Sequence, residues 1–163
     1  ESVTDSGGVY FVPALTGLGA PHWDPEARGM ISGLTRGSEK GHLARATLEG
    51  IAHQNDDILT AMMADSGSPI TALKVDGGAA ANGLLMQIQA DLLGCEIIRP
   101  KMLETTALGS GIMAGLAVGM WSNLSEVTDR WSIDARFKRC INEDEVGRRR
   151  EGWRAALQKT RSV

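Results

Sequence analysis

Residues 71–82, Thr-Ala-Leu-Lys-Val-Asp-Gly-Gly-Ala-Ala-Ala-Asn, combine residue types that could bind a ligand. A short apolar strand leads into Gly77 and Gly78, and a helix is expected to start near Asn82. Glycine lets a ligand approach the backbone closely, and a helix N-terminus offers free N–H groups to an anion. Nucleotide phosphates and riboses are typical occupants of such a strand–turn–helix corner. The same glycines could also serve a plain strand-to-helix connection, so the pattern leaves both interpretations open.

The other residues that could carry chemistry show no productive spacing. His22, His42 and His53 have no partners at metal-ligand spacing, and His53 is expected to be a packing or solvated residue of a helix. Cys95 and Cys140 are far apart and match no metal or redox motif. We therefore expect two reduced thiols, as in a cytoplasmic protein, and no metal site.

The composition is that of an ordinary globular domain. The chain has 163 residues, 42% of them hydrophobic and 23% charged, which suits a single domain with an apolar core. The formal net charge is −3, yet residues 136–163 hold an excess of Lys and Arg. These basic residues form one short terminal cluster, whereas a nucleic-acid surface spreads its basic groups along a groove with stacking aromatic side chains. We expect a solvated helix face and no nucleic-acid partner.

The chain shows no membrane or secretion signal in its pattern. Its first eight residues are polar or small, unlike the start of a signal peptide. The longest apolar stretch, residues 106–121, contains Ser110 and four glycines and is shorter than the roughly 20 residues that cross a bilayer. We expect no membrane span and a cytoplasmic location.

Periodicity predicts the elements that must position the candidate corner. Apolar runs at 9–15, ended by Pro13, and at 29–35 indicate short strands. Residues 42–64 have helical spacing, and residues 65–67 supply a stop. The predicted inner face of this helix consists of Leu48, Ile51, Asn55, Ile58 and Met62.

A strand–helix–strand–helix order follows. Strand 71–76 leads into helix 82–93, and Gly94 occupies the position of a left-handed helix cap. A strand at 95–100 and a helix at 106–120 complete a βαβα unit with parallel strands. The inner face of helix 82–93 is expected to consist of Leu85, Ile88, Gln89 and Leu92.

The last forty residues predict a weak strand near 131–137 and a final helix from about Asp144. Val146, Trp153 and Leu157 give that helix a narrow apolar stripe. No repeat or low-complexity linker interrupts the chain. We therefore predict a single α/β domain over residues 1–163.

The 106–120 helix carries Gly111, Gly115 and Gly119 at intervals of four. Each mid-helix glycine costs about 0.5–1 kcal/mol relative to alanine, so the repeat requires a reason. One interpretation is tight packing of the glycines onto the sheet. The other is a hinge contact with a second domain.

Several segments resemble the FGGY carbohydrate kinases and, within them, the glycerol kinases. Residues 16–25, Thr-Gly-Leu-Gly-Ala-Pro-His-Trp-Asp-Pro, resemble a glycerol kinase segment that usually has Tyr at the position of His22. Residues 29–49 contain a pattern similar to the C-terminal signature of the FGGY family. Residues 75–82 resemble its adenosine motif, and residues 104–109 resemble the start of its second interdomain helix.

The resemblance runs from about Val9 to Leu157 and implies an actin-like fold, in which two ribonuclease-H-like domains hinge around ATP and substrate. This chain would be most of the C-terminal, nucleotide-binding domain of such a two-domain kinase, with the early strands of that domain missing. ATP with Mg²⁺ would phosphorylate the 3-hydroxyl of glycerol. The glycine helix would then contact the N-terminal kinase domain.

The resemblance also assigns site residues. Gly78 and Ala79 would contact the nucleotide through their backbone, and Asn82 would face the adenine or the ribose. Asp76 and Gly77 would shape the loop. The family's N-terminal phosphate loop, its glycerol-holding residues and its aspartate base all lie in segments upstream of this chain. No catalytic residue is therefore assigned, and the chain alone is predicted to be inactive.

Partners and alternatives follow from the same resemblance. We expect a homo-oligomer, to which helix 42–64 could contribute a contact. A different FGGY kinase acting on xylulose or gluconate is the alternative enzyme. A non-catalytic binding or assembly module of the same fold is the alternative from another class, and residues 148–150 could then form a docking surface.

Overall fold

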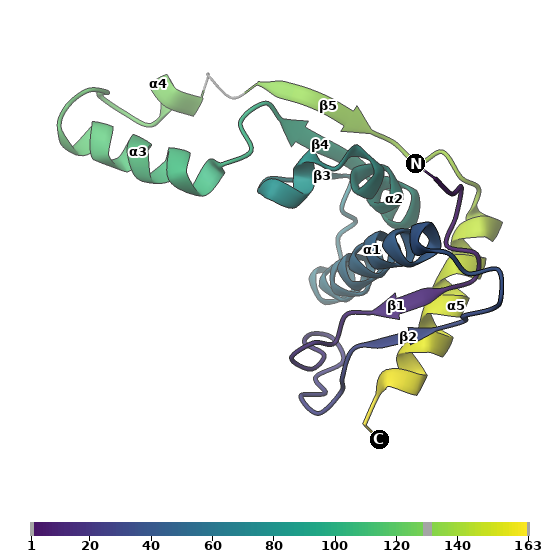
Figure 1. Ribbon diagram of the computed structural model, residues 1–163. Helices are drawn as coiled ribbons and strands as arrows, with labels where there is room; N and C mark the ends of the chain where they lie inside the picture. The colour runs from purple at the N-terminus through teal and green to yellow at the C-terminus, as the bar shows by residue number, and fades with distance from the viewer. Residues whose placement is uncertain (1, 129–131, 163) are drawn as a thin grey trace.

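The computed structural model describes residues 2–128 and 132–162. Figure 1 labels its elements in chain order. They are β1 (Tyr10–Val12), β2 (Met30–Ser32), α1 (Lys40–Ser66), β3 (Ala72–Lys74), a 3₁₀ turn η1 (Gly78–Ala81), α2 (Gly83–Leu93), β4 (Glu96–Pro100), α3 (Thr105–Ala117), α4 (Ser125–Thr128), β5 (Ile133–Phe137) and α5 (Glu143–Thr160).

The strands form two small sheets. β1 and β2 pair antiparallel, while the second sheet has the order β3–β4–β5. β3 and β4 are parallel and α2 connects them, which confirms the predicted parallel unit. β5 pairs antiparallel with β4 and confirms a strand within 131–137, although position 131 lies outside the described residues.

Helix α1 lies between the two sheets, with α2 on one side and β1 on the other (Figure 1). Two apolar cores result. The first joins α2 and β4 and contains, among others, Leu85, Ile88, Leu92 and Ile97. The second joins β1, the loop after it and α5, and consists of Val12, Ala14, Leu18, Ala27, Trp153, Ala156 and Leu157. The stripe predicted for the last helix is therefore confirmed.

The predicted extent of α1 is confirmed, and Gly67 ends it in the left-handed conformation with φ 63°. The predicted inner face is wrong in its second half, because Ile58 is 39% and Met62 54% exposed. The buried residues are Ala46, Gly50, Ala52, His53 and Asp56. Small residues face inward because β1 approaches α1 closely. The two polar residues face inward because α5 supplies a stacking partner, Trp153, to His53 and a hydrogen-bond donor, Arg150, to Asp56.

Helix α2 matches the prediction closely. All four residues of its predicted inner face are buried. Gly94 ends the helix with φ 69°, a conformation that favours glycine. Its apolar face packs over β4, the strand that follows it, and the helix also contacts the η1 turn.

Helix α3 and the short α4 extend beyond the end of the β3–β4–β5 sheet, away from α1, α2 and α5 (Figure 1). Gly119 lies outside α3, in the left-handed region with φ 76°, and Gly115 packs against Trp121. A Cβ on Gly109 or Gly111 would meet nothing within 4 Å. Packing of the glycine row onto the sheet is therefore wrong for this structure.

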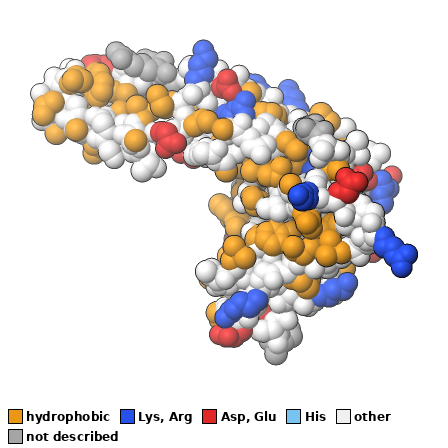
Figure 2. Space-filling view, in the orientation of Figure 1, with side chains coloured by type: hydrophobic (Ala, Val, Ile, Leu, Met, Phe, Trp, Pro, Cys, Tyr) orange, Lys and Arg blue, Asp and Glu red, His pale blue; other side chains and the backbone are white. Residues whose placement is uncertain are grey.

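The projecting arm, residues 102–127, carries exposed apolar side chains, and Figure 2 shows hydrophobic atoms spread over it. They include Met102, Leu108, Met113, Val118, Met120 and Leu124. Among the described residues, no helix is both long and apolar enough to cross a membrane.

Candidate functional site

The candidate corner begins where β3 ends. Gly77 adopts φ 81°, which side chains rarely tolerate, and its N–H donates to the carbonyl oxygen of Leu103 at 2.8 Å. The chain then forms the η1 turn, and Asn82 caps α2 as its last residue before the helix. The helix start near Asn82 is confirmed, but a 3₁₀ turn that begins at Gly78 precedes it.

The corner is open to a ligand. A Cβ built on Gly77 or Gly78 would meet nothing within 4 Å. Gly78 and Ala79 are exposed, and within residues 2–128 and 132–162 no hydrogen bond takes their backbone N–H groups. Ala80, by contrast, is 2% exposed and anchors the turn in the first core. The turn therefore presents free N–H donors from an anchored backbone.

Asn82 has both a structural role and a free donor. Its Oδ1 accepts the N–H of Leu85 at 3.1 Å, the hydrogen bond expected of a helix-capping asparagine. The side chain is exposed, and its amide nitrogen has no partner among the described residues. The predicted contact of Asn82 with adenine or ribose thus stays a prediction, with the amide N–H₂ as the available group.

Two motifs that are separate in the sequence meet at this corner. The hydroxyl of Thr105, at the start of α3, donates to the carboxylate of Asp76, just after β3. Together with the Gly77–Leu103 bond, this contact ties the loop before α3 to the turn. Asp76 therefore shapes the loop, as expected, and couples it to α3.

One residue that contacts the corner, Arg99, was not predicted from the sequence. Arg99 of β4 donates from Nη1 to the carbonyl oxygens of Ala80 and Ala81 at 3.1 and 3.3 Å. An arginine in a predicted strand gives no indication of such a contact. Only the parallel pairing of β3 and β4 brings it under the turn.

The histidines lie away from the corner and have structural partners. His22 Nε2 is 2.9 Å from Asp57 Oδ2, and His42 Nδ1 accepts the N–H of Glu39 at 3.0 Å. His53 is buried and stacked on Trp153 with ring centroids 5.1 Å apart, which confirms its packing role. Burial lowers the pKa of His53 to about 4.

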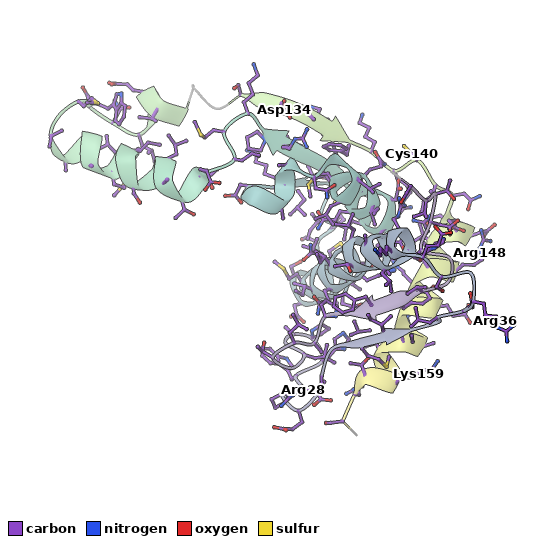
Figure 3. All side chains as sticks on the ribbon, in the orientation of Figure 1. Arg28, Arg36, Asp134, Cys140, Arg148 and Lys159 are labelled. Carbon is purple, nitrogen blue, oxygen red and sulfur yellow. The ribbon has the colours of Figure 1, made fainter. Side chains whose placement is uncertain are left out.

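Both thiols are free, as expected. Cys95 is buried, and burial raises its pKa, while Cys140 is exposed in the connection between β5 and α5 (Figure 3). The described residues contain no group of three or more His, Cys, Asp or Glu that could hold a metal ion.

The basic cluster of α5 is more structured than the predicted solvated face. Arg149 pairs with Glu145 at 2.7 Å, and Arg150 pairs with the buried Asp56 at 2.6 Å. Arg148, labelled in Figure 3, is exposed and pairs with Glu145 as well. These cations are therefore paired with carboxylates: Arg148 and Arg149 with Glu145 within α5, and Arg150 with Asp56 of α1.

Comparison with known proteins bears on this geometry. Residues 1–118 match the model of the FGGY family of carbohydrate kinases, C-terminal domain. The chain belongs to this family. It therefore has the actin-like ATPase fold of FGGY kinase C-terminal domains, as predicted.

The most informative relatives are glycerol kinases. The chain is 52% identical over 159 residues to glycerol kinase 2 of Saccharolobus solfataricus, covering 98% of this chain and 32% of that protein. It is 55% identical over 157 residues to the glycerol kinase of Burkholderia cenocepacia, covering 96% and 31%. A crystal structure of Plasmodium falciparum glycerol kinase with ADP matches with a TM-score of 0.83 and 36% identity, covering 97% and 32%. The chain spans about a third of the length of these relatives.

Proposed function

We propose that this chain is the ATP-side, C-terminal part of a longer ATP:glycerol 3-phosphotransferase. The open turn at Gly78 and Ala79 is the observation that carries the proposal, because two unpaired N–H donors stand beside a backbone with space around it. The identity of 52–55% with glycerol kinases supports glycerol as the acceptor. The similarity to Plasmodium falciparum glycerol kinase, whose crystal structure is with ADP, supports an adenine nucleotide as the ligand.

In this proposal the chain binds and orients the nucleotide. The backbone N–H groups of Gly78 and Ala79 donate to it, and the side-chain amide of Asn82 donates to the adenine or the ribose. Gly77 keeps the approach free of side-chain atoms. The γ-phosphoryl group of ATP leaves ADP and forms a bond to the 3-hydroxyl oxygen of glycerol, whose proton passes to a base outside this chain. Catalysis of such transfers depends on positioning both partners and on neutralising charge.

Mg²⁺ accompanies ATP in this reaction class and neutralises phosphate charge there. The described residues offer no cluster of three potential metal ligands. Mg²⁺ in phosphoryl-transfer sites is bound mainly by the substrate phosphates with one or two carboxylates, so the ion would be held largely by the phosphates of ATP. No residue of this chain is assigned as a metal ligand.

The proposed partner is an N-terminal kinase domain on the same polypeptide. A groove of about 700 Å³ runs along the projecting arm, with Met102, Leu108, Ile112 and Trp121 among its lining residues. Its apolar lining is typical of a surface that another part of a protein covers. Contact of α3 with that domain, through the arm, fits the interdomain role that we predict for the glycine helix. A homo-oligomer stays a prediction.

Expression of the complete kinase and of residues 1–163 alone tests the proposal. The complete kinase should consume ATP in the presence of glycerol, and residues 1–163 should not, since the glycerol-holding groups and the base are outside them. The same assay is run with xylulose and with gluconate. Turnover of either sugar substrate without turnover of glycerol would replace the proposal with the alternative FGGY kinase.

A further inference from the structure

The η1 turn has almost no side chain of its own with which to hold its shape. Its residues are one glycine and three alanines, and only Ala80 is buried. Hydrogen bonds to its backbone must therefore keep it in place. Internal bonds from Ala80 N to Gly77 O and from Asn82 N to Ala79 O close the turn at 3.0 and 3.1 Å.

Arg99 supplies a tie from outside the turn. Its Nη1 donates to the carbonyl oxygens of both Ala80 and Ala81. These carbonyls lie at the far end of the turn from Gly78, so the guanidinium can fix the backbone without occupying the open corner. Hydrogen bonds from a charged donor are stronger than neutral ones, which suits a single residue that restrains several peptide units.

The guanidinium is itself held in position by β5. Arg99 Nε donates to Asp134 Oδ2 at 2.8 Å, and the side chain of Arg99 is only 18% exposed. The ring of Phe137 lies beneath the guanidinium, 5.3 Å from ring centroid to Cζ, in cation–π geometry. Three contacts thus fix the orientation of a side chain that would otherwise be mobile.

A β-bulge explains how Asp134 reaches Arg99. In the β4–β5 ladder Arg99 pairs with Ala135, yet Pro100 pairs with Ile133. Asp134, labelled at the beginning of β5 in Figure 3, is the extra residue between them. Bulges re-aim side chains and are common next to functional sites. Here the bulge allows a β5 carboxylate to pair with a β4 guanidinium at the edge of the candidate site.

We propose that Arg99 is a positioning residue for nucleotide binding, held by Asp134 and acting through the backbone of the η1 turn. The inference rests on the proposed function, because it assigns a purpose to the turn that Arg99 restrains. Arg99 sets the direction of the N–H groups of Gly78 and Ala79. Its loss should weaken the nucleotide interaction while glycerol binding stays intact.

The test measures KM for ATP, KM for glycerol and kcat in the complete kinase, for the Arg99→Gln, Arg99→Lys and Asp134→Asn variants. Arg99→Gln should raise KM for ATP by about tenfold, as loss of charged hydrogen bonds would. Arg99→Lys should raise KM for ATP less. An ammonium group can still bond a carbonyl oxygen of the turn, but it cannot also bond Asp134 as the guanidinium does. Asp134→Asn should shift KM for ATP in the same direction. KM for glycerol should not change in any of the three.

Arg136→Gln is the matched control. Arg136 is also on the β3–β4–β5 sheet and pairs with Glu96. The Arg136→Gln variant therefore removes one positive charge, as Arg99→Gln does, but leaves the contacts of the η1 turn unchanged. Hydrogen–deuterium exchange gives a second measurement: peptides covering 77–82 should exchange faster in Arg99→Gln, and peptides within 86–93 should not. If Arg99→Gln fails to fold, the same comparison of KM for ATP with KM for glycerol is made with the Arg99→Lys and Asp134→Asn variants.

Gly78→Val, measured in parallel, separates this inference from the proposed function. A raised KM for ATP in Gly78→Val together with unchanged values in the Arg99 and Asp134 variants would overturn the role of Arg99 alone. An unchanged KM for ATP in folded Gly78→Val would overturn the proposed nucleotide site and the inference with it. A general loss of kcat and of thermal stability, with KM for ATP unchanged, would reduce Arg99 to a structural residue and overturn the proposal.

Discussion

Asp56 of α1 and Arg150 of α5, 94 residues apart in the chain, form a two-point ion pair with Nε–Oδ2 and Nη2–Oδ1 distances of 2.7 and 2.6 Å. Asp56 is 4% exposed. Arg150 also donates to the carbonyl oxygen of Leu92 at the end of α2, at 3.0 Å. The hydrogen bond to Asp56 raises the pKa of Arg150 above its ordinary value. One guanidinium therefore joins three helices.

Removal of one member of this pair should be costly. Arg150→Met leaves the Asp56 carboxylate buried without its partner, and we expect a loss of about 2–4 kcal/mol in the free energy of unfolding. The lower part of the usual range applies because the Arg150 side chain is 32% exposed. Urea unfolding followed by tryptophan fluorescence measures the change. Arg148→Met, which breaks an exposed pair, should change stability by less than about 1 kcal/mol, and equal losses in the two variants would contradict the prediction.

This pair also shows where sequence reasoning on the fold stops. The inner face of α2 could be predicted because apolar residues repeat at helical spacing and face a strand nearby in the chain. The buried side of α1 could not, because His53 and Asp56 look like exposed residues until α5 supplies their partners. These polar side chains are buried because of partners distant in the chain, and the hydrophobic periodicity of a helix does not identify such partners.

Gly50 sets the distance between α1 and β1. A Cβ at this position would lie 2.2 Å from the carbonyl oxygen of Phe11, a backbone atom that cannot easily move. Gly50→Ala should therefore destabilise the protein by about 1–3 kcal/mol despite the better helix propensity of alanine. Thermal or urea unfolding measures the loss.

Gly111 provides the matched control for Gly50. It also lies within a helix, but an added Cβ would meet nothing within 4 Å. Gly111→Ala should be neutral or stabilise by up to about 1 kcal/mol. A Gly50→Ala variant as stable as Gly111→Ala would mean that α1 and β1 are not in close contact.

Buried His53 should make stability depend on pH. Its pKa falls from 6.5 to about 4 in the folded protein, because burial disfavours the charged ring and Asp57 only partly opposes this. Between these pH values the unfolded chain binds a proton at this residue and the folded chain does not, so its contribution decreases stability as the pH falls below 6.5. Above that range both states are neutral and the contribution vanishes.

His53→Phe should remove this dependence and keep the stacking on Trp153. Between pH 7 and pH 4.5 the free energy of unfolding should fall by about 2–3 kcal/mol less in the variant than in the parent chain. Urea unfolding of both proteins at a series of pH values measures this difference. Carboxylate titrations contribute equally to both proteins and therefore cancel. If stability fell equally with pH in the two proteins, the pKa of His53 would be the same in the folded and unfolded states, which would contradict the prediction.

Gly78→Val tests the open corner directly. Gly78 has an ordinary φ and open space around its α-carbon, so the variant should fold. A branched side chain would occupy the space beside the free N–H groups, and we expect ATP affinity to fall by about tenfold or more. Calorimetric titration of the complete kinase measures this. Ala72→Val adds similar bulk to an exposed position of β3 and should leave the affinity unchanged; equal affinities for all three proteins would remove Gly78 from the site.

The corner could be recognised from the sequence because its parts are contiguous: a strand, Gly77, Gly78 and the capping Asn82 follow one another within residues 71–82. Its supports could not be. Thr105 reaches Asp76 and Arg99 reaches the η1 turn from other elements, and Asp134 pairs with Arg99 at a bulge in the β4–β5 ladder. Local sequence encodes the backbone conformation, whereas the restraints on that backbone arise from strand register.

The composition of the two cores has a consequence for synthesis on the ribosome. The core around α2 and β4 draws mainly on residues 48–103 and is complete well before the chain ends. The other core joins Val12, Ala14, Leu18 and Ala27 to Trp153, Ala156 and Leu157. Its N-terminal half therefore lacks the apolar side chains of α5 until that helix leaves the exit tunnel, although α1 already packs against β1. During that interval we expect β1 and its loop to be the segment on which chaperones act.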